Sequence, residues 1–553
     1  MSEKFLLNPF AINNEKTPPS KSMFSRERPK QKTVVASDTE LSSLDTQYGI
    51  TELFGVKMNN ETQRFFKALT TWLEDEDIEI LLEKDDNVIN PRGELTHFYC
   101  SYSSKIRNLP ELPSSLEVLI CKENEIFDPL PRLPAGLREL HCSNNPLLKS
   151  LPELPEGLQI LDCSYNRSLD SLPKLPTGLQ KLECSYSRGL RVLPELPEGL
   201  TELCFADTSI AKLPKLPSSL QLMHCTGSFI EELSELPEGL KHLLCSNVMI
   251  SELPRLPAGL ESLFCFSTNI QQLPELPDTL KEFDCSSNEK LTSIPNLPAS
   301  LIELDCSYTG LTELPEIPPN LSILDCSNTS LETLSDLPDS LKELNCSGTP
   351  IHTISKLPSN LTVFNCETSS IREIPELPEG LQALNCDNTK VSRLPKLPST
   401  LRELWCSNIP DLESIPELPE GLRALHYSST KIPLVPKLPK GLRELTLSDK
   451  FVENLPELPE DLNILNCSGT SIDTCPELPV GLRRLNISDT NISALPELPT
   501  GLIELNCSFT DIEELSELPA GLGVLICSDT PLADNHEAIA DLQKKYPNLE
   551  ITW

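Results

Sequence analysis

The sequence predicts an α/β-type repeat solenoid that occupies most of the 553 residues. The string Leu-Pro-Glu-Leu-Pro-Glu-Gly-Leu begins at Leu151, begins again at Leu193, and returns with small changes almost every 20 or 21 residues. A second observation is that each unit fits the template LxxLxLxxNxL, with cysteine usually at the third apolar position. One repeat cannot bury its own apolar side chains, so the repeats must stack. We therefore expect a leucine-rich-repeat horseshoe or superhelix of about 22 short repeats.

Each repeat has two parts that call for different backbone conformations. The LxxLxC segment should form a short parallel strand, whose apolar side chains point inward and whose intervening side chains face the concave side. The Leu-Pro-x-Leu-Pro segment has too many prolines for a helix, because proline lacks a backbone donor. It should run extended and polyproline-like along the convex side. The Thr or Asn after the strand should bond to backbone groups of the turn.

The repeats lead us to expect four regions. Residues 1–50 are polar and contain scattered Lys and Arg, which indicates a disordered leader, with a secretion or targeting segment as the open alternative. Residues 51–94 should form a helical N-terminal cap, with Asn60 capping a helix over 60–83. Residues 95–532 are the repeats. Residues 533–553 should form a C-terminal cap, with a helix over 534–545 and a last strand over 548–553. The apolar face of the N-terminal helix is Phe65, Phe66, Leu69, Trp72 and Leu73, followed by Ile78, Ile80, Leu81 and Leu82.

Cysteine occupies the same position in most repeats. In four of the 22 repeats that position is Phe205, Tyr427, Leu447 or Ile487, none of which can bind metal or form a disulfide. The cysteines are therefore predicted to be small buried apolar residues. The ladder comprises Cys100, Cys121, Cys142, Cys163, Cys184, Cys225, Cys245, Cys265, Cys285, Cys306, Cys326, Cys346, Cys366, Cys386, Cys406, Cys467, Cys507 and Cys527.

Two cysteines, Cys204 and Cys475, lie outside this ladder. Cys204 comes one position early, where a side chain should face the concave side, so we expect it to be the most exposed thiol. No C-x₂-C pair of the zinc-binding type occurs, and we expect no cofactor and no metal. A zinc or redox ladder remains the alternative to plain burial. So many free thiols fit a reducing compartment.

The charge balance restricts the classes of partner. Asp and Glu total 82 against 46 Lys and Arg, for a net charge of −36. This argues against nucleic acid, because phosphate binding needs a positive surface. No run of 18 apolar residues suggests a membrane span, and the N-terminus does not read as a Sec signal peptide. The sequence contains no HExxH, GxSxG or P-loop motif, so we expect no enzyme.

Positions expected on the concave face suggest where a protein partner would bind. Strand positions that face solvent have no structural reason to be apolar, so clusters of apolar and aromatic residues there indicate hot spots. A polar series occupies the same strand position elsewhere: Asp284, Asp305 and Asp325, which could attract a cation, and then Asn345, Asn365 and Asn385, which could bond to one another. The predicted partner-binding residues are Leu222, His224, His242, Leu244, Phe264 and Phe266, with a second anchor at Trp405 and His426.

The repeats of residues 95–532 resemble those of the LPX-type leucine-rich-repeat effectors of Gram-negative pathogens, the family that contains YopM and the IpaH and SspH ligases. The order of leader, helical cap and repeats is also similar. The resemblance implies delivery into host cells by a secretion apparatus and binding of host proteins. This chain departs from the family in its Cys-Ser-x-Thr strand exit. Only 21 residues follow Leu532, whereas the ligases continue into a catalytic domain, so the resemblance points to the non-enzymatic, YopM-like branch.

These observations lead to one expected function with two rivals. We expect a non-enzymatic protein-binding scaffold, an effector delivered into the host cytoplasm or nucleus, whose partners carry basic patches. The first rival is a surface or structural protein of the bacterium, such as an adhesin, in the cell envelope or the bacterial cytoplasm. The second is the substrate-recognition part of a ubiquitin ligase. The identity of the partner and self-association stay open.

Overall fold

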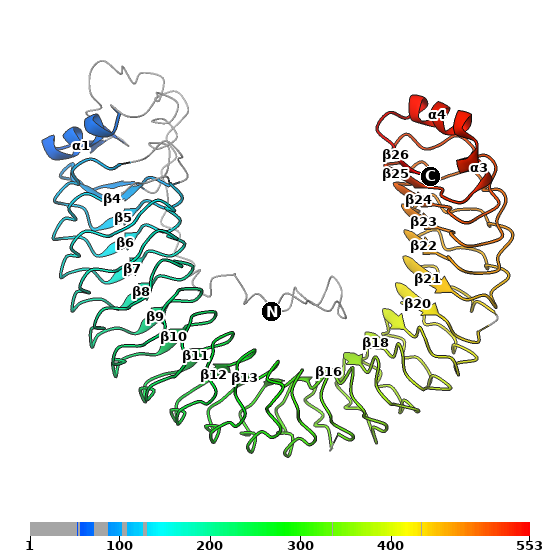
Figure 1. The fold of residues 1–553 in the computed structure, drawn as a ribbon, viewed down its shortest axis with the longest axis horizontal. Helices are drawn as coiled ribbons and strands as arrows, with labels where there is room; N and C mark the ends of the chain where they lie inside the picture. The colour runs from blue at the N-terminus through cyan, green and yellow to red at the C-terminus, as the bar shows by residue number, and fades with distance from the viewer. Residues whose placement is uncertain are drawn as a thin grey trace. The chain divides into compact units, whose positions relative to one another are not determined.

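A computed structural model gives the arrangement of the chain in residues 52–53, 56–70, 87–101, 108–124, 130–334, 336–432 and 434–553 (Figure 1). The expected leader over 1–50 and the second half of the expected helix over 60–83 lie outside the described residues. The described residues divide into two compact units, one ending at Lys290 and the other spanning Leu291–Trp553. Within each unit, Figure 1 shows the strands along the inner side of the curve and irregular segments along the outer side.

The unit that ends at Lys290 begins with a small antiparallel pair, a helix and a further short strand, and continues as a parallel sheet. Strand β3 pairs antiparallel with β4, and from β4 to β13 each strand pairs in parallel with the next in sequence. Its elements are β1 (Glu52–Leu53), β2 (Val56–Lys57), α1 (Asn60–Thr70), β3 (Val88–Ile89), β4 (Leu95–Tyr99), β5 (Val118–Ile120), β6 (Glu139–His141), β7 (Ile160–Asp162), β8 (Lys181–Glu183), β9 (Glu202–Cys204), β10 (Leu222–His224), β11 (His242–Leu244), β12 (Ser262–Phe264) and β13 (Glu282–Asp284).

The unit Leu291–Trp553 continues the same pattern and ends in two helices and a last strand. All of its strand pairs are parallel and join consecutive strands. Its elements are β14 (Glu303–Asp305), β15 (Ile323–Asp325), β16 (Glu343–Asn345), β17 (Val363–Asn365), β18 (Ala383–Asn385), β19 (Glu403–Trp405), β20 (Ala424–Ser428), β21 (Glu444–Ser448), β22 (Ile464–Asn466), β23 (Arg484–Asn486), β24 (Glu504–Asn506), β25 (Val524–Ile526), α3 (Pro531–Asp534), α4 (His536–Lys545) and β26 (Glu550–Thr552).

The hydrophobic core is built from equivalent positions of successive repeats. Each predicted repeat from Leu95 to Leu532 contributes one strand, β4 to β25, so the predicted leucine-rich-repeat solenoid is confirmed. Parallel pairing in equal register places each apolar position over its equivalent in the next repeat. Stacking therefore buries the apolar side chains that a single repeat would leave exposed to solvent. In the repeat that begins at Leu381, the buried apolar side chains include Leu381, Leu384, Cys386, Val391, Leu394 and Leu397.

The proline-rich segments form neither helix nor strand within the described residues. Each instead ends in a tight turn, in which a leucine N–H donates to the carbonyl of the proline three residues earlier, as Leu158 does to Pro155 at 3.0 Å. This turn returns the chain to the start of the next strand. The prediction that these segments run extended rather than helical agrees with the structure.

The exit of each strand is a second recurring turn. The second residue after the cysteine slot has a positive φ in most repeats, as in Asn144 (φ 55°) and Gly348 (φ 65°). The residue after it bonds to backbone: Thr309 Oγ1 donates to Cys306 O at 2.6 Å, and Asn145 Nδ2 donates to Cys142 O at 2.9 Å. The predicted role of this Thr or Asn position is therefore confirmed.

Helix α1 packs on the first strand of the parallel stack. The rings of Phe65 and Phe66 meet Phe98 of β4 edge to face, with centroids 4.8 and 6.2 Å apart. The capping residue is Asn59 rather than the predicted Asn60, because Asn59 Oδ1 lies three residues before Thr62 and accepts its N–H at 2.8 Å.

The chain ends in two short helices where one was predicted over 534–545. Asn535 lies between α3 and α4 and caps α4, since its Oδ1 accepts from Ala538 N–H at 3.1 Å. Strand β26 pairs in parallel with β25, close to the predicted last strand. Within the described part of the chain, the helices are too short or too polar to cross a lipid bilayer.

Candidate binding surfaces on the strand face

Two columns of side chains reach solvent on the strand face, which is the sheet face opposite the core. In β19, Leu404 is buried together with the Cys406 that follows, whereas Glu403 and Trp405 are half-buried. The alternation follows from the two-residue period of a strand. Because the strands pair in equal register, residues of one column lie beside one another, about 4.8 Å apart.

The predicted hot spot in the unit that ends at Lys290 is assembled by this register. His224, Leu244 and Phe264 are consecutive Cα partners in β10, β11 and β12. Leu222 and His242 are partners in the other column. All five side chains are half-buried, so part of each remains accessible on the strand face. We call these five residues the β10–β12 patch.

The polar members of the patch differ in how they are satisfied. His242 Nδ1 lies 3.2 Å from Ser262 Oγ, which in turn donates to Glu282 Oε2 at 2.9 Å. His224 Nε2 is buried and has no hydrogen-bond partner among the described residues. Burial lowers the pKa of His224 to about 4, so the ring is neutral at physiological pH and adds to the apolar character of the patch.

Two expectations about this region are wrong. Phe266 is 8% exposed, so it belongs to the core behind the strand exit and offers little surface to a partner. Cys204 is 1% exposed rather than the most exposed thiol. Its short side chain lies between Glu183 and His224, its neighbours in the same column, and both are longer. Cys475 is the cysteine that is only half-buried.

The second predicted anchor forms a stacked pair in the unit Leu291–Trp553. Trp405 and His426 are register partners in β19 and β20, and their rings are 5.2 Å apart and nearly parallel, with 5° between the planes. Both are half-buried. Burial lowers the pKa of His426 to about 4, although Glu444 Oε1 lies 3.9 Å from its Nε2. The pair is therefore an uncharged, flat aromatic surface.

The predicted aspartate series bonds mainly to its own strand exits. Asp305 and Asp325 are register partners in β14 and β15, and each Oδ1 accepts from the N–H of the serine two residues later at 3.0 Å. Burial, and then the charge of Asp305, raises the pKa of Asp325 to about 6. Asp284 makes the same bond to Ser286 in the other unit. In the described residues, no three His, Cys, Asp or Glu side chains converge as a metal site would require.

The predicted amide-to-amide bonds are wrong for the asparagine series. Asn345, Asn365 and Asn385 each accept, through Oδ1, the N–H of the residue two positions later, at 3.0 to 3.2 Å. No hydrogen bond joins two of these amides, because a backbone donor two residues ahead is closer than the next repeat. Asn345 Nδ2 donates instead to Asp325 Oδ2, and Asn385 Nδ2 to Glu367 Oε2.

The ladder cysteines are all buried, and none of them forms a disulfide within the described residues. Several thiols lie close to the carbonyl of the following strand, as in Cys386 Sγ, 3.3 Å from Trp405 O. Burial raises the pKa of Cys225 and Cys346 to about 12, so these groups remain protonated and unreactive at neutral pH. Their position suits packing rather than chemistry.

One charged cluster was not foreseen. Lys122 Nζ lies 2.7 Å from Asp162 Oδ2, and His141 lies between Asp162 and Glu139 at 3.5 and 3.4 Å. Burial alone would lower the pKa of His141, but the two carboxylates outweigh it and raise that pKa. The sequence could have predicted this cluster, since His141 and Asp162 occupy one column in adjacent repeats. The charges pair with each other, which leaves little for a partner.

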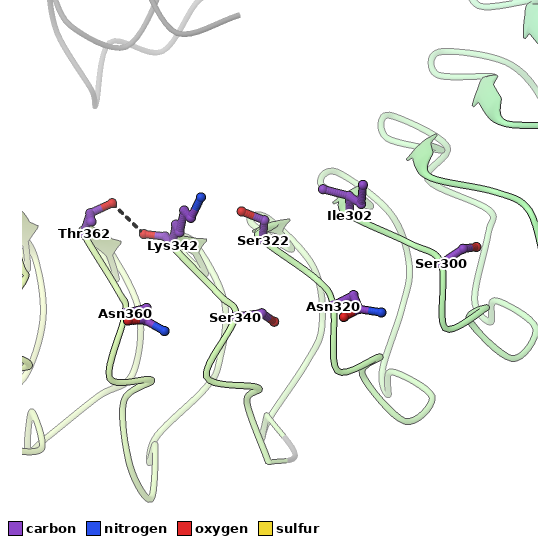
Figure 2. Close-up of a pocket in the computed structure, with 8 residues that line it drawn as sticks. All are labelled: Ser300, Ile302, Asn320, Ser322, Ser340, Lys342, Asn360 and Thr362. Atoms are coloured by element: carbon purple, nitrogen blue, oxygen red, sulfur yellow. Dashed lines mark hydrogen bonds between the residues drawn. The ribbon is translucent and has the colours of Figure 1, made fainter.

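A shallow groove also escaped prediction. It has a volume of about 690 Å³ and lies at the strand entries of β14 to β17, in the unit Leu291–Trp553. Figure 2 shows two columns of lining side chains, one with Lys342 and Thr362 and the other with Ser340 and Asn360. Ser340 and Asn360 donate to carbonyls of the preceding repeat at 2.7 and 2.8 Å. In the first column Thr362 Oγ1 likewise donates to Lys342 O, at 2.9 Å, whereas the Lys342 side chain is exposed.

Comparison with known proteins gives matches at the level of structure. No protein-family profile and no curated protein sequence matches the chain. YopM from Yersinia enterocolitica WA-314 matches with a TM-score of 0.68 and 29% identity, over 84% of this chain and 99% of that one. A YopM structure described as a leucine-rich effector protein from Yersinia pestis is 30% identical over 55% of this chain and 86% of that one, with a TM-score of 0.48. A TDR receptor is 20% identical over 78% of this chain and 84% of that one, with a TM-score of 0.48.

Proposed function

From the premise that this chain is a leucine-rich-repeat protein similar to YopM, we propose that it is a non-enzymatic scaffold that binds host proteins on its strand face. The likeness to YopM supports the proposal, because it extends over nearly all of that protein. Leucine-rich-repeat solenoids expose long faces that bind partners, which is how this fold is generally used. The site, rather than the fold, must carry the argument for binding.

The β10–β12 patch is the observation that carries the proposal. Its leucines and phenylalanine are partly accessible at positions that the core does not require to be apolar. Around them, the same columns hold charged residues such as Glu183 and Asp284. An apolar centre with a charged rim is the usual composition of a protein interface.

The net charge of the chain favours basic partners at long range. With a net charge of −36, the chain attracts proteins that carry basic patches and repels acidic ones at long range. Association should weaken as salt rises from 0.1 M to 1 M, since the screening length falls from about 10 Å to about 3 Å.

Delivery into a host cell is the second element of the proposal. It rests on the likeness to YopM, a protein described as an effector. The test is a translocation reporter fused to the chain and expressed in the source bacterium during infection of cultured cells. A cytoplasmic reporter signal that needs the bacterium's secretion apparatus supports delivery. Retention in the bacterial envelope would favour the surface-protein rival.

Affinity capture from host-cell lysate tests the binding surface. The test variant is Leu244→Asp/Phe264→Asp, which places charges in the β10–β12 patch. Its matched control is Val192→Asp/Met249→Asp, which adds the same charge at exposed apolar positions of the same unit, 69% and 57% exposed. We expect a small set of proteins captured by the parent and the control, and lost in the test variant while its circular dichroism is unchanged. Equal capture by all three would refute the role of the patch.

A further inference from the structure

A column of arginines runs beside the strand entries of β19 to β23. Arg402, Arg423, Arg443 and Arg483 each follow the first buried leucine of a repeat, with Asn463 in the intervening repeat. We call these four residues the arginine stripe. Their backbones are joined directly: Arg423 N–H donates to Arg402 O, and Arg443 N–H to Arg423 O, at 2.7 and 2.8 Å. The first three side chains therefore start one repeat apart, at about 4.8 Å spacing, and Arg483 follows two repeats after Arg443.

The stripe carries charge that the rest of the structure does not neutralise. Arg423, Arg443 and Arg483 are exposed, and in the described part of the chain no carboxylate lies within 4.0 Å of their side chains. Arg402 is held in place, since its Nη1 donates to Gly421 O at 2.9 Å. Three exposed guanidinium groups without a carboxylate partner, two of them in adjacent repeats, are unexpected in a chain with a net charge of −36.

The stripe continues the groove of Figure 2. The groove column that contains Lys342 and Thr362 is the same column, and it reaches Arg402 through Gln382 by an unbroken series of backbone bonds of 2.7 to 2.8 Å. The result is a strip with a lysine and hydroxyl-bearing side chains at one end and arginines at the other. All of it lies in the unit Leu291–Trp553.

An aromatic surface lies next to the stripe. Trp405 and His426 follow Arg402 and Arg423 by three residues in the same repeats, which is about 10 Å along an extended strand. Between them lies Glu403, and Glu444 follows in β21. Burial raises the pKa of Glu403 and of Glu444 above their ordinary values.

We propose that the arginine stripe binds an acidic, extended segment of a partner protein, with its carboxylates on the guanidinium groups and an apolar side chain against Trp405 and His426. Guanidinium groups bind carboxylates in a planar, bidentate geometry, and Arg and Trp are the residue types most enriched in interface hot spots. A polynucleotide fits less well, because a long polyanion would extend beyond the stripe and meet the acidic remainder of the chain. The inference rests on the proposed binding function and adds a second, oppositely charged class of partner segment.

Fluorescence anisotropy with the purified full chain tests the inference. The probe is a fluorescein-labelled ten-residue peptide of alternating glutamate and glycine, which places all carboxylates on one side when extended. A glutamine–glycine peptide and a twelve-residue oligothymidine are the comparison ligands. The test variant is Arg423→Gln/Arg443→Gln. Its matched control is Arg372→Gln/Arg393→Gln, which removes the same charge at exposed arginines outside the stripe.

We expect the parent and the control to bind the acidic peptide equally, and more weakly at 500 mM than at 50 mM salt. The test variant should bind about tenfold more weakly, since two exposed charge contacts together are worth roughly that factor. No binding at 50 mM salt, equal loss in both variants, or oligothymidine binding as tight as the peptide would each overturn the inference. If the acidic peptide does not bind but lysate capture succeeds, only the proposed role of the arginine stripe is refuted. If the acidic peptide binds but no protein is captured from lysate, only the proposed role of the β10–β12 patch is refuted.

Discussion

Alkaline pH should unfold this protein far more readily than it unfolds most proteins, because of its many buried cysteines. Burial contributes to raising the pKa of 17 cysteine thiols above the ordinary value. For a group whose pKa is higher in the folded state, the stabilisation is complete below the unfolded pKa, here 9.0, and is lost as pH rises toward the folded pKa. Base therefore favours the unfolded chain, in which the thiols can ionise.

The size of the effect follows from the number of thiols. At pH 9.0 half of each unfolded thiol is ionised, which lowers the free energy of unfolding by about 0.4 kcal/mol per thiol and by about 7 kcal/mol for all of them. Above that pH each thiol contributes a further loss that approaches about 1.4 kcal/mol per pH unit. Since whole domains are stable by only about 5–15 kcal/mol, the transition should fall between about pH 9 and pH 10.

Urea unfolding followed by circular dichroism in a reducing buffer, at pH 7.5, 8.5, 9.0 and 9.5, measures the effect. A comparison variant replaces Cys225, Cys245 and Cys346 with alanine. Whatever its stability at pH 7.5, its further loss up to pH 9.0 should be about 1.2 kcal/mol smaller than in the parent. The same urea midpoint at pH 7.5 and pH 9.0 would show that the thiols are not held protonated by burial.

Three further predictions concern single positions. Phe98→Ala should destabilise the fold by about 3–5 kcal/mol in urea unfolding, because it removes the ring on which Phe65 and Phe66 pack; a loss below about 1 kcal/mol would contradict that packing. Gly348→Ala should cost at least about 1–2 kcal/mol, since φ there is 65° and the added Cβ would also press on the side chain of Asn328, whereas Gly259→Ala, at an ordinary φ and without such a contact, should be nearly neutral; equal effects would refute this argument. A thiol reagent applied to the native chain should label Cys475 first, as mass spectrometry of tryptic peptides can show, and earlier labelling of Cys204 would contradict its burial.

The repeating part of the fold could be predicted because each of its features appears about 22 times. A residue such as Cys386 is surrounded by its own equivalents, so the alternation of one repeat predicts the burial of all. The register that brings His224, Leu244 and Phe264 together follows from the same logic, since equal repeat lengths align equal positions.

The sequence was less informative where a side chain depends on the size or bonding of its neighbours. Cys204 occupies a solvent-facing column and is nevertheless buried, because Glu183 and His224 are longer. The amide of Asn365 lies beside Asn345 in the same column. The Asn345 side-chain oxygen nevertheless accepts from the backbone N–H of Ser347, which is closer. The arginine stripe was visible as a pattern, but only the structure shows that three of its members have no ion-pair partner among the described residues.

The residue of positive φ at the strand exit has a consequence for how such a chain diversifies. That position asks for a backbone conformation rather than for a particular side chain, and it already holds Tyr165, Phe509 and Gly348 in equivalent repeats. The side chains of Tyr165 and Phe509 are 49% and 59% exposed, so exchanging them leaves the core untouched. Most repeats thus carry a variable position beside the strand face, where a substitution can create a new contact while changing one local turn.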